Sequence, residues 1–139
     1  TIQMSLSLST RKFPSVTSIL GATEDYTSLY IWQCEQIQKH GSIGFKIISE
    51  KNKKSGTNFH KAVELLLKGL KDYGKISDHL FKKVLMEVMT KDDEMYLIGI
   101  LPFLKTIPKT EWMEVEKNCT NYYFSYTGKF DAIVELECV

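Results

Sequence analysis

Three ionisable residues have types and spacings that could hold a divalent cation. His60 and Glu64 stand four residues apart in "SGTNFHKAVELL", residues 55–66, and Asp131 follows much later in "YTGKFDAIV". Residues four apart lie on the same face of a helix, so His60 and Glu64 can reach one point. Mg²⁺ prefers carboxylate oxygens, and an added imidazole suits Mn²⁺. The spacing therefore predicts half of a metal site, and the alternative is a solvated His–Glu pair on a helix surface.

Asp131 is a lone acid inside an otherwise apolar stretch. A buried carboxylate is costly unless it is paired or binds a metal. Side chains alternate between the two faces of a strand, so Phe130 and Ala132 would share one face and Asp131 would lie on the other with Lys129. The alternative to a metal ligand is an exposed residue on the polar face of an edge strand.

A basic segment, "EKNKKSG", precedes the segment that carries His60. It contains Lys51, Lys53 and Lys54 and ends at Gly56. We expect a loop here that leads into a helix N-terminus, where exposed N–H groups and a partial positive charge favour a phosphate. Lys53, Lys54 and Gly56 are therefore candidate contacts to nucleic acid, and the alternative is a solvated loop.

The elements that must position these residues are helical in the first part of the chain. Apolar residues recur there at intervals of three and four, the spacing of helices that bury one face. Gly41 would terminate the second helix, and Pro102 would kink or shorten the last one. The predicted helices are one capped by Ser15 or Thr17, one ending at Gly41, one from Thr57 to Leu70, one opened by Ser77 and one beginning at Asp92 or Asp93.

After Pro108 the sequence becomes rich in aromatic and β-branched residues, which favours strands. The predicted strands are "EWMEVEKN", "TNYYFSYTG" and "KFDAIVELECV", with Gly128 as the turn between the last two. The chain is thus predicted to be helical first and then to form a sheet that holds Asp131.

Length, charge and cysteine content restrict the class of protein. The 139 residues fit one domain, and a net charge of +1 means that nucleic-acid binding would have to rest on a local patch. Three cysteines without Cys-x-x-Cys spacing argue against a disulfide framework or a structural zinc site and favour a reducing compartment. Apolar runs are all shorter than a membrane span, so we expect no membrane contact.

Both ends of the sequence carry an expectation. "TIQMSLSLSTRKF" is rich in serine and has no acid before Glu24, which suits the tail of a mitochondrial transit peptide. We therefore expect residues 1–12 to be a flexible N-terminal segment. "DAIVELECV" stops within a strand-like run, from which we expect a fragment of a longer domain.

Taken together, the motifs resemble the RecB-like branch of the PD-(D/E)XK nuclease superfamily. A helical G-x-x-x-H-x-x-x-E followed by G-x-x-D at a strand carries the resemblance, within "FPSVTSIL" (13–20), "SGTNFHKAVELLL" (55–67) and "YTGKFDAIVEL" (126–136). Within that branch the chain is most similar to the mitochondrial genome-maintenance exonucleases. The resemblance implies an α/β fold with a restriction-endonuclease-like core. Residues 13–139 would supply its N-terminal helical region and the first antiparallel strands of its central sheet.

The resemblance also implies a role for individual residues. His60 matches the family's helical metal-binding histidine, Glu64 the acid that follows it, and Asp131 the first metal-binding aspartate. These three are the expected catalytic residues, and His60 and Asp131 the expected metal ligands. Ser15 and Thr17 match an S-V-T element whose hydroxyls would cap a helix or contact DNA.

The implied function is a metal-dependent DNA exonuclease that hydrolyses phosphodiester bonds at single-stranded DNA ends. It would use Mg²⁺ or Mn²⁺, act as a monomer, and serve mitochondrial DNA maintenance and repair. The ion would polarise the phosphate and generate hydroxide. The family's acid and lysine, two residues apart on the next strand, have no counterpart in "ELECV", because Glu135 and Glu137 are followed by no lysine.

Two alternatives to an active nuclease remain. The first is a catalytically incomplete nucleic-acid-binding fragment of the same family. The second is a helical protein-interaction module in which His60, Glu64 and Asp131 are surface residues. A short approach between His60 and Asp131 separates the first alternative from the second.

Overall fold

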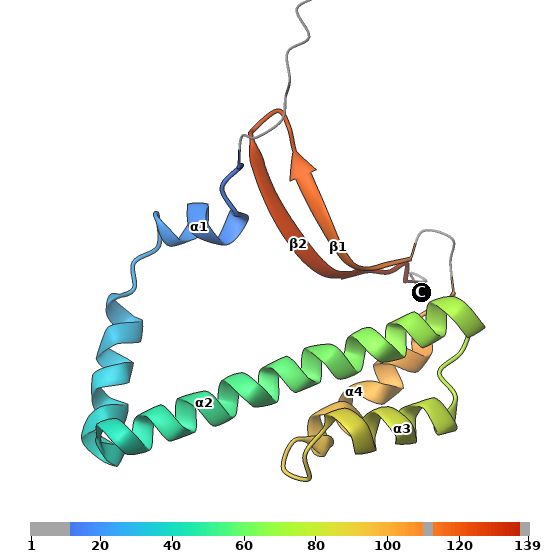
Figure 1. Ribbon diagram of the computed structural model, residues 1–139, viewed down its shortest axis with the longest axis horizontal. Helices are drawn as coiled ribbons and strands as arrows, with labels where there is room; N and C mark the ends of the chain where they lie inside the picture. Colours follow the sequence, from blue (N-terminus) through green and yellow to red (C-terminus); the bar gives the residue numbers. More distant parts are fainter. Residues whose placement is uncertain (1–11, 110–112, 137–139) are drawn as a thin grey trace, which may run out of the picture. The chain divides into compact units, whose positions relative to one another are not determined.

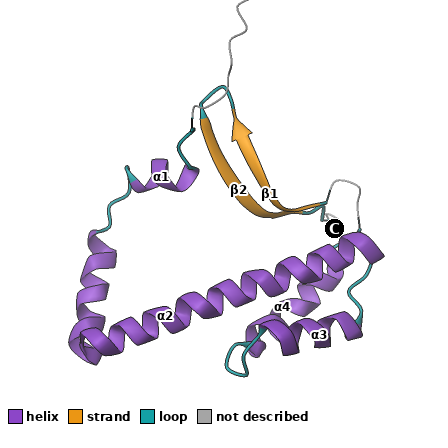
Figure 2. Cartoon of the chain, viewed as in Figure 1, coloured by secondary structure: helices purple, strands orange, loops and turns teal. Residues whose placement is uncertain are grey.

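The computed structural model describes residues 12–109 and 113–136, and these combine helices with strands. The expected flexible segment 1–12 therefore lies outside the described residues, apart from Lys12. In the described part, four helices precede a two-stranded antiparallel sheet, which confirms the predicted order of helix and strand (Figure 1; Figure 2). The elements are α1 (Val16–Gly21), α2 (Thr27–Tyr73), α3 (Asp78–Val88), α4 (Glu94–Thr106), β1 (Glu114–Asn121) and β2 (Tyr126–Ile133).

The chain divides into two compact units. The helical unit comprises Asp25–Lys117 and the residues from Phe130 onward. The tip unit comprises the described residues up to Glu24 together with Asn118–Lys129. The β1–β2 hairpin is therefore divided between them, with its turn in the tip unit and its base in the helical unit.

α2 consists of two helices that meet at Gly41, and the second runs without a break to Tyr73, so the predicted basic loop at residues 50–56 is wrong. Residues 51–56 are helical, whereas Gly41 has non-helical angles, with φ 72° and ψ 163°, which confirms the predicted end of the first helix there. Lysine and glutamate are good helix formers, and one glycine costs a helix only about 1 kcal/mol. Gly56 therefore lies inside a helix, not at its N-terminus, and the expected exposed N–H groups do not exist there.

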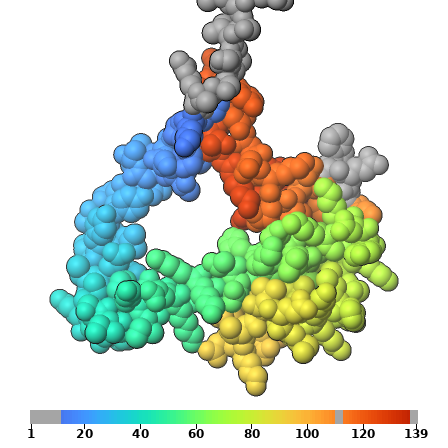
Figure 3. All heavy atoms as spheres, in the orientation of Figure 1, coloured from blue at the N-terminus to red at the C-terminus, as the bar shows by residue number. Residues whose placement is uncertain are grey.

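The core of the helical unit lies between the C-terminal half of α2 and the two following helices. Ala62, Leu66 and Leu70 are spaced by four residues and form one buried stripe along α2. Figure 3 shows the atoms of α3 lying against this half of α2. The buried partners of the stripe are Ile76, Val84, Met89, Leu97, Leu104, Ile107 and Met113.

Capping residues define the helix ends that position the core. Ser77 caps α3 by accepting a hydrogen bond from the backbone N–H of Leu80 at 3.1 Å, which confirms the predicted start. Gly74 ends α2 in the left-handed region at φ 77°, where glycine is favoured. α4 begins after Asp93, as predicted, and continues past Pro102 to Thr106, so Pro102 does not end it.

The hairpin turn lies at residues 122–125, so the predicted turn at Gly128 is wrong. The side chain of Asn121 accepts a hydrogen bond from the backbone N–H of Phe124 at 2.9 Å, and Ser125 takes a positive φ of 55°. Asparagine favours turns for this reason. Gly128 lies inside β2 instead, where an added Cβ would come within 3.1 Å of Val16 Cγ2.

The cysteines and the apolar character of the helices were the subject of two predictions from the sequence. Cys34 and Cys119 are exposed free thiols, and Cys138 lies outside the described residues. Among the described helices, none has both the length and the apolar character that crossing a bilayer requires.

Candidate metal centre

His60 on α2 and Asp131 on β2 come together in the helical unit. The His60 Nδ1 atom lies 3.4 Å from Asp131 Oδ2. Both side chains remain open to solvent, with 62% and 70% of their surface exposed. The structure thus places an imidazole and a carboxylate, distant in sequence, around one accessible point.

Local structure explains why these two side chains face solvent. On β2, Phe130 and Ala132 are half-buried and Asp131 is exposed, which confirms the predicted alternation. On α2, Phe59 packs against the core while the next residue, His60, is exposed. The Phe59 and His60 rings meet edge to face, with centroids 6.4 Å apart. The core contacts of their neighbours therefore position both candidate ligands.

A second ion pair joins the base of the hairpin to α2. Lys71 Nζ on α2 lies 3.4 Å from Glu114 Oε2 on β1. Lys117 lies 2.7 Å from the other oxygen of Glu114, and its hydrogen bond is the main reason that the pKa of Glu114 is lowered. Each strand therefore has a polar contact to α2: β1 through Glu114 and Lys71, and β2 through Asp131 and His60.

Glu64 is held by two lysines of its own helix. Its Oε2 atom accepts from Lys61 at 3.0 Å, and its Oε1 atom accepts from Lys68. The hydrogen bond from Lys68, followed by that from Lys61, lowers the pKa of Glu64. The side chain is only 14% exposed, in contrast to His60. Both carboxylate oxygens of Glu64 are therefore engaged by cations.

The donors at this point fit a cation that takes its other ligands from water and substrate. Within the described residues, no cluster of three or more histidine, cysteine, aspartate or glutamate side chains could enclose a metal. Mg²⁺ is commonly held by one or two carboxylates, several waters and substrate phosphates, and imidazole adds affinity for Mn²⁺. His60 and Asp131 therefore have the donor chemistry of an open site with two protein ligands.

No protein-family model matches the chain, and no curated protein matches it. The assignment of the site therefore rests on the sequence motifs and on the geometry of His60 and Asp131.

Ser15 and Thr17 lie in the tip unit at the start of α1. Ser15 Oγ accepts from the backbone N–H of Ser18 at 3.1 Å, which confirms its predicted role as a helix cap. The same oxygen lies 3.0 Å from Thr17 Oγ1 and 2.7 Å from Ser18 Oγ. Ser15 also forms a parallel bridge with Thr127 on β2. The predicted DNA contact of these hydroxyls stays a prediction.

Lys53 and Lys54 are exposed on α2, shortly after its kink. Lys53 lines a groove together with Trp32, Phe45 and Asn52. The Trp32 and Phe45 rings meet at 6.3 Å across the kink. A lysine beside aromatic rings is compatible with the predicted nucleic-acid contact, now through side chains on a helix and not through backbone N–H groups of a loop.

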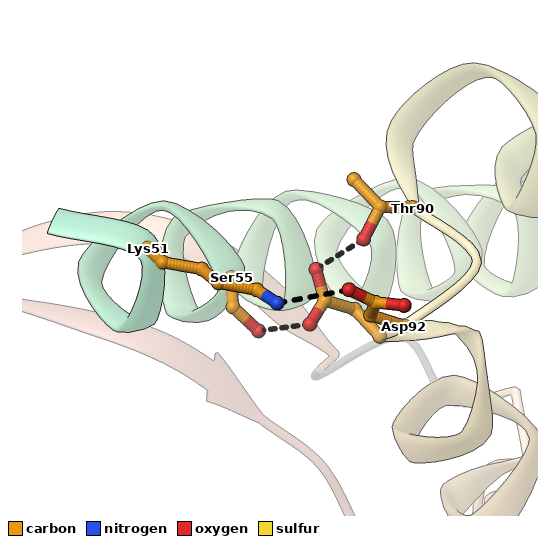
Figure 4. Close-up of polar contacts among 5 residues, drawn as sticks. Lys51, Ser55, Thr90 and Asp92 are labelled. Carbon is orange, nitrogen blue, oxygen red and sulfur yellow. Dashed lines mark hydrogen bonds and ion pairs between the residues drawn. The ribbon is translucent and has the colours of Figure 1, made fainter. Parts of the chain in front are cut away.

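Sequence reasoning missed a polar cluster that joins α2 to the loop before α4 (Figure 4). Asp93, only 7% exposed, accepts hydrogen bonds from Ser55 Oγ at 2.7 Å and Thr90 Oγ1 at 2.6 Å. The hydrogen bond from Ser55, then that from Thr90, lowers the pKa of Asp93. Lys51 pairs with Asp92 at 2.9 Å, and this hydrogen bond raises the pKa of Lys51. Two residues of the predicted basic loop therefore make contacts within the fold.

Proposed function

We propose that the chain supplies the first metal ligands of a metal-dependent DNA exonuclease with a RecB-like, restriction-endonuclease-like fold. Its substrate class is the single-stranded DNA end, and its place is mitochondrial DNA maintenance. The sequence motifs support the family, and the approach of His60 to Asp131 supports the site. That approach, 3.4 Å between Nδ1 and Oδ2, is the single observation that carries the proposal.

The two residues would act as ligands of one Mg²⁺ or Mn²⁺ ion. When bound, the ion polarises a phosphate oxygen and makes its water ligand a better nucleophile. Asp131 contributes negative charge that holds the cation, and His60 contributes a neutral imidazole nitrogen. The exposure of both side chains leaves room for the phosphate of a DNA end.

Glu64 takes a supporting position in this proposal. Its two lysine contacts lie on the same helix as His60, where Lys61 follows His60 directly and Lys68 is held by Glu64, one turn from His60. Lys61 and Lys68 are 54% and 49% exposed, so a phosphate can reach them. These cations would favour the approach of a DNA strand to the metal.

The test is Mn²⁺ binding to the whole chain, measured by calorimetry. We expect the wild type to bind, and both His60→Ala and Asp131→Ala to bind more than about tenfold more weakly. The matched control is His79→Ala, because His79 is also an exposed histidine but lies on α3, outside the His60–Asp131 pair. Binding unchanged in both ligand variants would contradict the proposal, as would no binding to the wild type.

A catalytically incomplete nucleic-acid binder is the second candidate function. It is favoured by one observation: within the described residues the site has two donors, His60 and Asp131, fewer than a complete nuclease centre uses. A 5′-labelled single-stranded oligonucleotide incubated with the chain and Mn²⁺ separates the two candidates. Shortening that disappears in Asp131→Ala favours the exonuclease, whereas metal-dependent binding without shortening favours the binder.

A further inference from the structure

The turn of the β1–β2 hairpin carries three consecutive aromatic residues that face solvent. Tyr122, Tyr123 and Phe124, called here the aromatic tip, are 78%, 88% and 68% exposed. Aromatic side chains contribute strongly to burial and to interfaces, and each can cover a large apolar area. A contiguous exposed group of them marks an interaction surface more often than scattered apolar residues do.

The tip is held in a defined conformation. The Asn121 side chain accepts from the backbone N–H of Phe124 at 2.9 Å, which closes the turn. The Tyr123 and Phe124 rings are perpendicular, with centroids 4.8 Å apart, and Tyr122 meets Phe13 edge to face at 6.1 Å. Rings that are ordered before binding lose little freedom on contact with a partner, so more of the contact energy appears as affinity.

The surroundings of the tip are neutral or basic. No residue from Asn118 to Gly128 carries a charge. Lys12 and Lys129 are exposed in the same unit, and its only described acid is Glu24. A carboxylate beside the rings would repel a phosphate chain, and the hairpin turn has none.

Hydroxyl groups line the strands next to the rings. Thr120 Oγ1 on β1 lies 3.3 Å from Thr127 Oγ1 on β2, and Thr127 donates to the carbonyl oxygen of Cys119 at 3.1 Å. Because the Thr127 proton is used within the hairpin, the solvent-facing hydroxyls are those of Ser125 and the two tyrosines of the aromatic tip, and such hydroxyls are common donors to phosphate oxygens. Flat rings for bases and hydroxyls for the backbone are therefore combined in one small unit.

We propose that the aromatic tip stacks the bases of a single-stranded nucleic acid. Every base has a flat π-face, so successive rings bind a strand without regard to its sequence. Bases inside a duplex are already stacked on one another, which restricts the tip to unpaired strands. The substrate class rests on the proposed function, and the tip adds a contact with the strand that does not require the metal.

A lipid surface is the competing partner of an exposed aromatic turn. Insertion of the turn into the apolar part of a bilayer would remove water from the exposed hydroxyls of Tyr122, Tyr123 and Ser125. These polar groups gain hydrogen bonds from a phosphate chain instead. The chemistry of the tip therefore favours a nucleic-acid strand.

The test is the affinity of the whole chain for a fluorescent oligothymidylate, measured by anisotropy in EDTA. We expect Tyr123→Ala and Phe124→Ala each to bind about tenfold more weakly than the wild type. Tyr73→Ala is the matched control, because Tyr73 is 80% exposed at the end of α2, outside the tip unit. Its affinity should equal that of the wild type.

Two further comparisons identify stacking as the cause. An abasic strand of the same length keeps its phosphates but has no bases, so wild type and tip variants should bind it equally. Tyr123→Trp should keep the affinity for oligothymidylate, whereas Tyr123→Leu, apolar but not flat, should lose it. A melting curve for each variant verifies that the fold is intact, as expected for exposed positions.

Three results would overturn the inference. The first is that the tip variants bind oligothymidylate as tightly as the wild type. The second is that the tip variants lose as much affinity for the abasic strand as for oligothymidylate. The third is that the tip variants keep their DNA affinity but sediment less with anionic phosphatidylserine vesicles than the wild type does. EDTA removes the metal from the measurement. Loss of Mn²⁺ binding alone therefore contradicts the proposed function, and loss of tip dependence alone contradicts this inference.

Discussion

At the scale of single residues, His60 and Glu64 lie on the same helix face but differ in their ion-pair partners. Glu64 is largely covered and held by Lys61 and Lys68, whereas His60 is exposed beside Asp131. A carboxylate with a cation on each oxygen contributes to the stability of the helix and is a poor metal donor until a lysine is displaced. His60 and Glu64 therefore have different roles, although they lie one turn apart.

Glu64→Gln tests this separation. Removing the charge should lower the free energy of unfolding by about 0.5–1 kcal/mol at neutral pH, because the lysine pairs are partly screened by solvent. Mn²⁺ affinity should change less than about twofold, since neither proposed ligand is altered. Urea unfolding and calorimetry give the two quantities. A loss of Mn²⁺ binding comparable to that in Asp131→Ala would make Glu64 a ligand after all.

The pH dependence of the same pair has a definite sign. The pKa of Glu64 is lowered by Lys68 and Lys61 in the folded chain, so the unfolded chain binds the proton more readily. The stabilisation is complete above the ordinary glutamate value of 4.5 and is lost as pH falls through the lower folded value. The difference in unfolding free energy between wild type and Glu64→Gln should therefore shrink from pH 7 to pH 3. A difference that grows in acid would contradict this assignment.

Residue spacing predicted the candidate metal ligands only in part. The spacing of His60 and the lone strand acid Asp131 each left a solvated alternative, and the family resemblance singled out this pair, which the structure brings together. The partner of Glu64 could not be chosen in this way, because the same rule also places Lys61 and Lys68 beside it. Which neighbouring side chain contacts Glu64 depends on rotamers and burial, and residue spacing gives no information on either.

At the scale of elements, the continuity of α2 after Gly41 is the feature that positions His60. The segment 51–56 is helical and carries Ser55 and Lys51, whose side chains contact the loop before α4. Local composition favoured a loop there because glycine, serine and asparagine weaken a helix. The contacts to Asp92 and Asp93 come from far along the chain, so the sequence window around residue 55 could not reveal them.

Two glycines of α2 give a matched test of this packing. Gly56 has open space at the Cβ position, so Gly56→Ala should stabilise the chain by about 0.5–1 kcal/mol through helix propensity. At Gly69 an added Cβ would overlap Leu80 Cδ2, so Leu80 must move. Gly69→Ala should therefore lower stability by about 1 kcal/mol, the overpacking cost exceeding the gain in propensity. Stabilisation by both substitutions, measured in urea, would contradict the packing of α2 on α3.

Asp93 and Asp92 form a second matched pair. Asp93 is buried with two hydroxyl donors, and its replacement by alanine leaves both without their acceptor. Asp93→Ala should lower the melting temperature by roughly 5 °C, whereas Asp92→Ala, which removes an exposed ion pair, should change it by about 1 °C or less. Equal shifts in the two variants would show that the contacts of Asp93 contribute nothing beyond a surface charge.

At the scale of the whole molecule, two units share one hairpin. Its base belongs to the helical unit, where Asp131 meets His60, and its turn belongs to the tip unit, where the aromatic residues are exposed.

The sequence predicted a strand over "TNYYFSYTG" because aromatic residues favour strands. The Asn121 contact instead places the turn at these aromatics, and asparagine at that position was the available signal. Long-range pairing of the strands with the N-terminal segment, through Ser15 and Thr127, had no local signal.

The most direct test of the account is whether His60 coordinates a bound metal. Pulsed electron paramagnetic resonance of Mn²⁺ on the whole chain detects modulation from a coordinated imidazole nitrogen. We predict this modulation in the wild type and in His79→Ala, and its loss in His60→Ala at a Mn²⁺ concentration that still loads the site. Mn²⁺ bound without a nitrogen signal, or with a signal that persists in His60→Ala, would contradict a shared site of His60 and Asp131.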